Sequence, residues 1–279
     1  MKPLLSLSRQ IEDLLVARNL RGMQQLQRAL RPGYYLRAAR ILNQCQGVIF
    51  IGTGFPVADT FETDGPVGAI ALYDCLQLLG ARPVLVCGDP LYSVLKTDYH
   101  CHPLPINSPQ NLAALAAEAL QHYQPQAVIS IERPGRARDG RYYNMRGEDI
   151  SSRCASFDDF LHLAACPTLA IGDGGNEIGM GNINAAVSKL NIIPAATECD
   201  ELLLADVSNW GAYGLIALLS VWREQDLLAQ VQPLRILQYL SDRGSVDGVS
   251  RLNTLTEDSL DASEGIAVIT SLRALCGFS

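Results

Sequence analysis

Five short apolar runs, separated by helical patterns, constrain the fold of this chain more than any other feature. None of the runs alternates with polar residues, which is typical of strands buried on both faces of a sheet. The runs are 47–51, 83–87, 127–131, 168–171 and 201–205, and the helical patterns between them are 67–79, 110–122, 157–165 and 183–190. Because strand and helix alternate in this order, we expect an α/β three-layer sandwich with a mostly parallel sheet and helices on both faces.

Further helical patterns lie on either side of this alternation. Residues 7–30 predict two helices with a break at 19–22, and 34–42 predicts a short third helix. After the last strand, helices are expected over 209–223, 233–242 and 263–276, with 243–261 forming a loop around a short helix. We expect a single α/β domain over 1–279, against which the N-terminal helices of 1–42 pack.

Composition excludes several classes of function. The 279 residues include 29 acidic and 22 basic side chains, and a net charge of −7 weighs against nucleic acid as a partner. No apolar stretch reaches the length of about 18 residues that a membrane span needs, and no secretory signal begins the chain. With eight scattered cysteines in addition, we expect a cytoplasmic protein. Its oligomeric state stays open.

Two common cofactors are also disfavoured. The loop after the first strand contains Gly52, Thr53 and Gly54, but Val57 stands where a dinucleotide fingerprint needs its third glycine, so we expect no NAD. Pyridoxal phosphate would require one of only three lysines, and Lys2, Lys96 and Lys189 all lie outside the glycine-rich loops.

The loops after the strands are the candidate site, because ligands bind at the carboxyl ends of parallel strands. Glu62 and Asp64 precede the expected start of a helix, whose amides can hold an anion, although Thr63 or Asp64 could instead cap that helix. After the last strand, Asn209 could complete the pocket together with Asp206 and Ser208, or Ser208 or Asn209 could cap the helix that follows.

The segment 132–153 is long, lacks an apolar period and is rich in arginine, which is typical of a lid or binding loop. Because a guanidinium matches a carboxylate in shape and charge, Arg133, Arg136 and Arg146 are candidates for binding a small anionic substrate.

The strongest site signal is the segment 171–184. It has five glycines within ten residues, Gly174 and Gly175 among them, which indicates positive φ angles or the close approach of a ligand. Asp173, Asn176 and Glu177 stand between the glycines. These oxygen donors fit Mg²⁺ or Mn²⁺, with Asp173 and Glu177 as ligands, or alternatively a general acid and base pair. A tight turn whose acids cap the next helix would explain the acids alone.

Taken together, IGTGFPV, SIERPGRARDGRYYNMRGEDIS, GDGGNEIGMGN and VSNWGAYG resemble the D-glutamate cyclase-like family, long known as a domain of unknown function, over about 11–276. The resemblance implies a hydro-lyase that converts D-glutamate to 5-oxo-D-proline with loss of water.

For that reaction, Glu177 or Asp173 would be the base or a metal ligand. Arg133 and Arg146 would hold the substrate carboxylates, and Tyr142 or Tyr143 would donate a proton. Two alternatives remain open: a non-catalytic protein that binds an acidic metabolite or nucleotide, and a divalent-metal-dependent hydrolase of a small phosphorylated metabolite.

Overall fold

A sheet of six parallel strands forms the middle layer of the molecule. The computed structural model describes residues 3–106 and 111–278. The strands of the sheet are β1 (Val48–Thr53), β4 (Arg82–Gly88), β5 (Cys101–Leu104), β6 (Ala127–Ile131), β7 (Thr168–Gly172) and β8 (Glu201–Leu204), and their order is β5-β4-β1-β6-β7-β8. Nearly all residues of β1, β4, β6, β7 and β8 are buried, as their apolar sequences predict.

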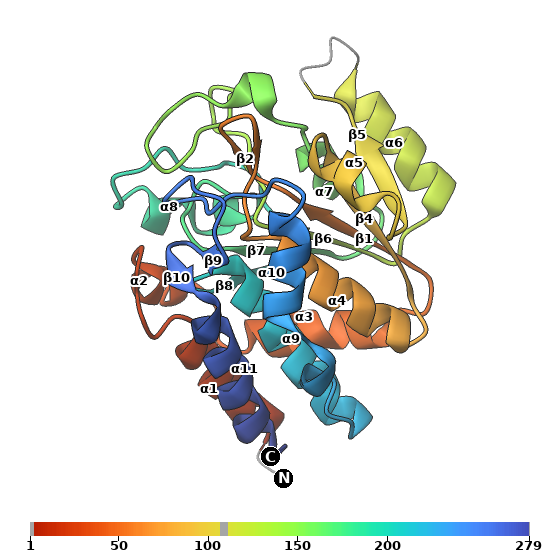
Figure 1. The fold of residues 1–279 in the computed structure, drawn as a ribbon, viewed down its shortest axis with the longest axis vertical. Helices are drawn as coiled ribbons and strands as arrows, with labels where there is room; N and C mark the ends of the chain where they lie inside the picture. Colours follow the sequence, from red (N-terminus) through yellow and green to blue (C-terminus); the bar gives the residue numbers. More distant parts are fainter. Residues whose placement is uncertain (1–2, 107–110, 279) are drawn as a thin grey trace.

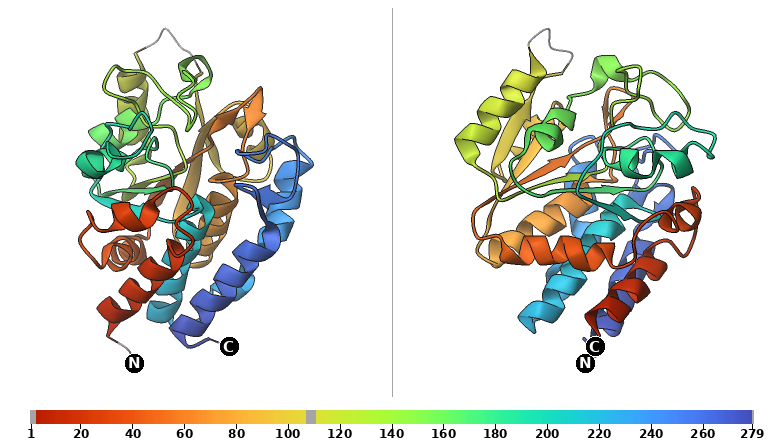
Figure 2. Two further views of the ribbon diagram at one scale, coloured as in Figure 1. Left: turned by 90° about the vertical axis from the view of Figure 1, so that its left-hand side faces the viewer. Right: turned by 180° about the vertical axis from the view of Figure 1, so that it is seen from behind.

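Helices cover both faces of this sheet (Figures 1 and 2). One face carries α1 (Leu4–Leu15), α3 (Tyr34–Gln44), α4 (Pro66–Leu78), α5 (Leu91–Leu95), α9 (Ser208–Arg223), α10 (Pro233–Ser241) and α11 (Ala262–Cys276). The other face carries α2 (Met23–Gln27), α6 (Leu112–Tyr123), α7 (Asp158–Leu163) and α8 (Asn184–Val187). Two apolar clusters, one under each layer, form the core. The expected α/β three-layer sandwich is therefore confirmed.

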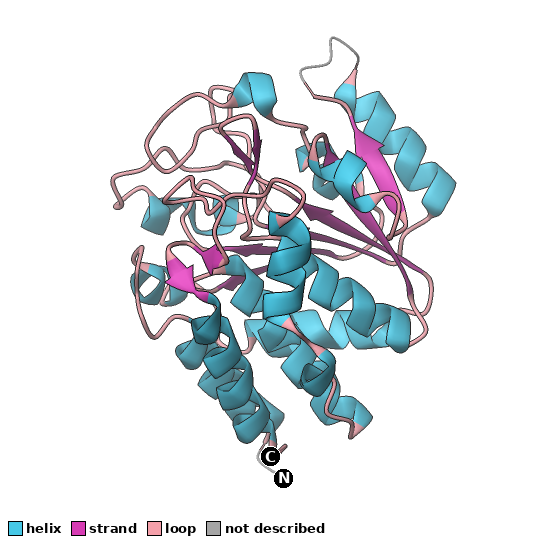
Figure 3. Ribbon diagram, in the orientation of Figure 1, coloured by secondary structure: helices cyan, strands magenta, loops and turns pink. Residues whose placement is uncertain are grey.

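Short elements complete the chain. The loops contain the strand pairs β2 (Pro56–Val57) with β3 (Thr60–Phe61) and β9 (Thr256–Glu257) with β10 (Leu260–Asp261), and the single turns η1 (Ser151–Arg153), η2 (Met180–Ile183) and η3 (Leu228–Gln230). Figure 3 shows that most of the loop segments lie on one side of the molecule. This side contains the carboxyl ends of β1, β6 and β7.

The sequence predicted five of the six strands but missed β5. This strand lies at the edge of the sheet, is only partly buried and contains Pro103, so it lacks the apolar run that marks the others. Two helix predictions were wrong. The helix expected over 183–190 is only α8, preceded by the turn η2, and no helix forms within 243–261, where β9 and β10 lie instead. The expected start of α6 at Gln110 lies outside the described residues.

The strand order creates a switch point between β1 and β6. From β1 the chain builds outward through β4 to β5, and it then returns to the other side of β1 to build β6, β7 and β8. The loops that leave β1 and β6 therefore diverge over opposite faces, which opens a crevice at their carboxyl ends. Thr53 and Ile131, the last residues of the two strands, are paired in register at this point.

The helices α4 and α9 exchange caps where they begin. Asp64, just before α4, accepts hydrogen bonds from the backbone nitrogens of Ser208 (2.9 Å) and Asn209 (2.8 Å) in the first turn of α9. In return, Oδ1 of Asn209 accepts bonds from the nitrogens of Gly65 (2.9 Å), just before α4, and Gly68 (2.6 Å), in its first turn. Asp64 thus caps mainly α9, and Asn209 caps α4, across the contact between the two helices. The prediction that Ser208 or Asn209 caps its own helix was wrong, because α9 already includes both.

The cap exchange requires the two helices to approach closely, and this makes Gly68 hard to replace. A Cβ at Gly68 would lie 2.8 Å from Cα of Asn209 and 3.0 Å from Cβ of Ala212. We expect Gly68→Ala to lower the free energy of unfolding by about 1–3 kcal/mol, because the backbone of α9 must move. Urea denaturation measures this. Gln77→Ala, at an exposed position of α4, is the control and should change stability by less than about 0.5 kcal/mol.

Glu257 supports the same contact and should make stability depend on pH. Its Oε1 accepts a hydrogen bond from Nδ2 of Asn209 (2.7 Å), and burial, with the nearby Asp64 carboxylate, raises the pKa of Glu257 to about 8. A raised acid pKa in the folded state favours the protonated form, so stability is lost as the pH rises from about 5 through 8. Glu257→Gln removes this loss.

The free energy of unfolding of Glu257→Gln should therefore rise relative to the original chain by several kcal/mol between pH 5 and pH 9, at about 1.4 kcal/mol per pKa unit. Denaturation at both pH values measures the change. A difference between the two proteins that stayed constant with pH would contradict the raised pKa.

Candidate active site

A pocket of about 380 Å³ opens at the carboxyl ends of β1, β6 and β7. It lies at the switch point of the sheet, where the fold predicts a ligand. Five separate segments line it: Leu20 and Arg21; 55–58 with Glu62; Glu132 with 144–146 and Arg153; Asp173, Asn176 and Glu177; and 248–249 with Arg251, Asp258 and Leu260.

Backbone hydrogen bonds hold these segments together. The nitrogen of Ile178 donates to the carbonyl of Arg133 (3.0 Å), and this bond joins the loop after β7 to the loop after β6. On the opposite wall, the nitrogen of Thr63 donates to the carbonyl of Val246 (2.9 Å), and this bond joins the loop after β1 to the segment after α10.

Carboxyl groups make up the floor of the pocket. Six acidic side chains converge there, and in each no more than about a tenth of the surface is exposed: Glu62, Asp64, Glu132, Asp173, Glu177 and Asp258. They come from the loops after β1, β6 and β7 and from the turn between β9 and β10. We call these six the acid cluster. Ionised carboxylates are costly to bury, so the cluster requires protons, cations or hydrogen-bond donors to balance it.

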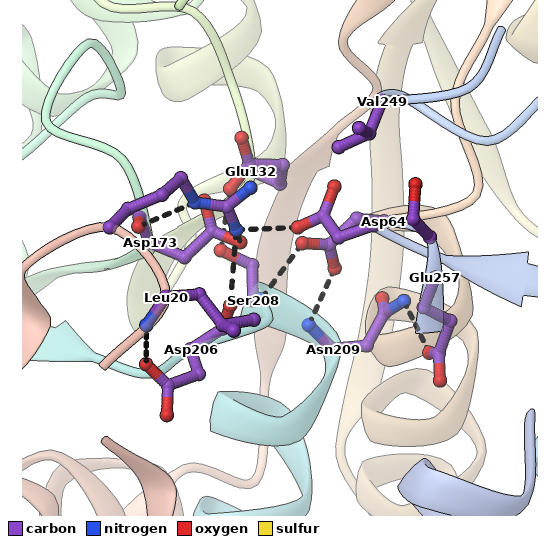
Figure 4. Close-up of polar contacts among 12 residues, drawn as sticks. Leu20, Asp64, Glu132, Asp173, Asp206, Ser208, Asn209, Val249 and Glu257 are labelled. Atoms are coloured by element: carbon purple, nitrogen blue, oxygen red, sulfur yellow. Dashed lines mark hydrogen bonds and ion pairs between the residues drawn. The ribbon is translucent and has the colours of Figure 1, made fainter. Parts of the chain in front are cut away.

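Arg21 is the one basic side chain that reaches the acid cluster from among the described residues. Its guanidinium forms ion pairs with Asp173 and Asp258, and its Nε donates to the carbonyl of Asp173 (3.0 Å). Asp206 holds the turn that carries Arg21 by accepting bonds from three consecutive backbone nitrogens, Leu20 included (Figure 4). Asp206 thus supports the site from outside the pocket.

The pKa values of five members of the acid cluster, Glu62, Asp64, Glu132, Asp173 and Glu177, are raised. Burial is the largest cause, and neighbouring carboxylates add to it, so the pKa values of Glu62, Glu132 and Asp173 lie well above the usual range. Burial also raises the pKa of Glu177, while the hydrogen bond from the nitrogen of Gly175 opposes the change. The pKa of Asp64 rises only to about 6, because the amides of α9 favour its ionised form. Such groups can hold protons near neutral pH.

Glu132 has an unusual backbone conformation at this point. Its φ angle is +46°, in the left-handed region that residues other than glycine rarely adopt. The side chain is held by the hydroxyl of Ser208, which donates to Oε2 over 2.6 Å. Strain of this kind is often found at functional sites, where the surrounding structure maintains it.

Of the residues predicted from the sequence, the structure brings five to the pocket: Glu62, Arg146, Asp173, Asn176 and Glu177. Asp64 and Asn209 lie beneath it, in the cap exchange. Figure 4 shows Asp64, Glu132 and Asp173 above Ser208 and Asn209.

The predicted residues Arg133, Arg136, Tyr142 and Tyr143 do not line this pocket and make contacts within the protein. The buried guanidinium of Arg133 donates to the carbonyl oxygens of Thr53 (2.7 Å) and Ala155. Arg136 donates to Ser156 and Asp159. The hydroxyl of Tyr142 is buried, 2.7 Å from Oδ2 of Asp158, and burial raises its pKa. These contacts shape the long loop. Tyr143 instead donates to Asp139 on the surface.

The predicted glycines serve packing. Gly52, Thr53 and Gly54 do not line the pocket, and a Cβ at Gly52 would lie 2.3 Å from the ring of Phe157. Gly175 has a φ angle of +113°, and a Cβ at Gly174 would lie 2.7 Å from Oε1 of Glu177. The glycines after β7 therefore let the loop fold around its own glutamate. The atoms that lie close to these glycines in the structure belong to other side chains of the protein.

The sequence reasoning missed five charged pocket residues: Arg21, Glu132, Arg153, Arg251 and Asp258. Glu132 and Arg153 had a usable signal, because both belong to the segment 132–153 and Glu132 directly follows β6. The other three lie outside the loops that directly follow the strands of the sheet.

Two solved structures are similar to this chain at low sequence identity. An exopolyphosphatase-related protein from Bacteroides fragilis superposes with a TM-score of 0.41 and 9% identity, over 89% of this chain and 58% of that one. A mycobacterial protein solved with NADPH gives a TM-score of 0.32 and 12% identity, over 90% and 63%. Neither likeness is close enough to bear on function. Among the described residues, no helix is both long and apolar enough to cross a membrane.

Sequence comparison is more informative. The human mitochondrial D-glutamate cyclase is 34% identical over 218 residues, which cover 67% of this chain and 34% of the human protein. This chain thus matches about a third of the length of that relative. The family model described as D-glutamate cyclase-like, C-terminal, matches residues 11–273. The chain belongs to the D-glutamate cyclase-like family.

Proposed function

We propose that this protein converts D-glutamate to 5-oxo-D-proline with loss of water, in the pocket above the acid cluster. The observation that supports this most is the separation of charge in the pocket. Its floor carries the acid cluster, whereas its other lining residues include three arginines, Arg146, Arg153 and Arg251. An amino dicarboxylic acid has the complementary charges, one ammonium and two carboxylates.

The three arginines, which we call the arginine rim, are held but not buried. Arg146 donates to the carbonyl of Val249 (3.0 Å), Arg153 donates to that of Ala58, and Arg251 pairs with Glu148 (2.9 Å). Each guanidinium has five N–H donors, so donors remain for a substrate carboxylate. We place the carboxylates of D-glutamate at the arginine rim and its amino group toward the acid cluster.

Ring closure requires two protons to move from nitrogen to oxygen. The α-ammonium loses two protons in all as its nitrogen bonds to the γ-carbon, and one γ-oxygen leaves as water after it gains two. No net proton is taken up. Glu177 suits this transfer, because it is buried, lines the pocket and has a raised pKa, so its carboxyl can accept a proton from nitrogen and deliver it to the departing oxygen.

The direct test is incubation of the purified protein with D- or L-glutamate, with 5-oxoproline quantified by chiral chromatography. We expect product from D-glutamate, and a decrease in kcat of about 10²–10⁴ in Glu177→Gln, because proton transfer contributes that much. Glu118→Gln, at an exposed position of α6, is the matched control and should retain full activity. Unchanged turnover by Glu177→Gln would refute the assignment, and ligand binding without product would favour a sensor.

The arginine rim should act on substrate binding. We expect Arg146→Gln to raise KM for D-glutamate about tenfold or more with little change in kcat, because it removes a charged hydrogen bond worth about 1.5–3 kcal/mol. Steady-state kinetics measure both constants. Arg138→Gln is the control, since Arg138 belongs to the same loop but is exposed outside the pocket and donates to Asn184. Equal effects of the two substitutions would exclude a specific role for Arg146.

A further inference from the structure

Three members of the acid cluster are arranged as a set of metal ligands. Each of Asp64, Glu132 and Asp173 offers a carboxylate oxygen, and the three oxygens lie within 4.8 Å of one another. All three side chains are buried (Figure 4). Glu132 and Asp173 directly follow β6 and β7, and the first turn of α9 holds Asp64 beside them. We propose that these three residues bind a divalent metal ion, Mg²⁺ or Mn²⁺. This inference deepens the proposed function, and it rests on the same pocket.

The ligand atoms retain capacity for a metal. Asp64 accepts three backbone N–H bonds, two at Oδ1 and one at Oδ2, which leaves a lone pair on Oδ2. Glu132 accepts the hydroxyl of Ser208 at Oε2, and its Oε1 accepts no hydrogen bond from the residues that the structure describes. A carboxylate oxygen of Asp64 and one of Asp173 lie within 4.8 Å of each other. Two buried carboxylates this close favour a shared proton or a cation between them.

A second observation points independently to a ligand. The side chain of Asn176 is 98% buried and lines the pocket on the same loop as Asp173. Its Nδ2 donates to the carbonyl of Tyr143 (2.9 Å), but its Oδ1 has no partner among the described residues. An orphaned buried oxygen is costly, so it requires a donor or a cation that the protein alone does not supply.

The balance of charge and the type of donor favour a hard divalent ion. Arg21 is the one guanidinium that reaches the six acids, and it is already shared between Asp173 and Asp258. The donors are carboxylate and amide oxygens, which suit Mg²⁺ or Mn²⁺, whereas Zn²⁺ prefers histidine and cysteine. Such an ion would balance the negative charge of the acid cluster that Arg21 leaves uncompensated.

This set of ligands differs from the pair expected from the sequence. Asp173 is common to both, but Glu177 is not part of the closely spaced group. Oε2 of Glu177 instead accepts the backbone nitrogen of Gly175 (2.7 Å). We therefore assign Asp173 to the metal and Glu177 to proton transfer, the two roles that the sequence left open.

Metal binding can be tested without any substrate. Protein freed of metal with a chelator is titrated with Mn²⁺, and the free ion is followed by electron paramagnetic resonance. We expect one ion per chain, and affinity weakened at least about tenfold in both Glu132→Gln and Asp173→Asn, since each loses a charged ligand. Glu12→Gln, at a buried acid of α1 that accepts the nitrogen of Gly33 and lies outside the acid cluster, should change affinity by less than about threefold. Melting curves show that each variant is folded.

The outcomes separate this inference from the proposed function. No saturable binding up to millimolar Mn²⁺, or equal affinity in all three variants, would overturn the metal site. Mn²⁺ binding that depends on Glu132 and Asp173 in a protein that leaves D-glutamate unchanged would support the metal site and contradict the cyclase. Turnover of D-glutamate that persists fully in the chelated protein, with no Mn²⁺ bound, would support the cyclase and contradict the metal site.

Discussion

The exchange of hydrogen bonds between Asp64 and Asn209 fixes the geometry on which the pocket depends. It joins the first turns of α4 and α9, two helices that leave strands at different positions in the sheet. Because α9 begins at this contact, the hydroxyl of Ser208 lies where it can hold Glu132 at the end of β6. One contact between two helices therefore aligns groups from three strand ends. Tight packing, with no room for a Cβ at Gly68, maintains that alignment.

The contact between Asp64 and the first turn of α9 also makes the pKa values of neighbouring acids differ. Two helix N-termini, each with a partial positive charge, meet at Asp64, and its pKa is raised only to about 6. Glu132 accepts a single hydroxyl, and its pKa lies well above the usual range. The ionised form is therefore favoured more at Asp64 than at Glu132, so negative charge is unevenly distributed between them. A ligand that brings positive charge would change this distribution, because it would stabilise the ionised form of every acid around it.

The sequence predicts those features that depend on local patterns. Apolar runs identified the five strands, and the rule that ligands bind after parallel strands placed Asp173, Asn176, Glu177 and Glu62 in one pocket. That rule also points to Glu132. Contacts across the fold were not predictable: Asp258 lies in a turn of β9 and β10, and no pattern shows that Arg133 would be buried against backbone carbonyl oxygens. An arginine in a loop has the same sequence signature whether it binds a ligand or its own chain.

Arg21 changes how the functional unit should be delimited. The alternation of strand and helix begins only at β1, so the helices before it look like an accessory layer. Yet the turn between α1 and α2 supplies the guanidinium that balances Asp173 and Asp258. A shortened protein that begins at α3 would retain all six strands of the sheet and all six carboxyl groups of the acid cluster. The acid cluster would, however, lose Arg21, its basic partner. In domain mapping or recombination with relatives, the N-terminal boundary must therefore be drawn ahead of Arg21, by charge balance and not by the extent of the sheet.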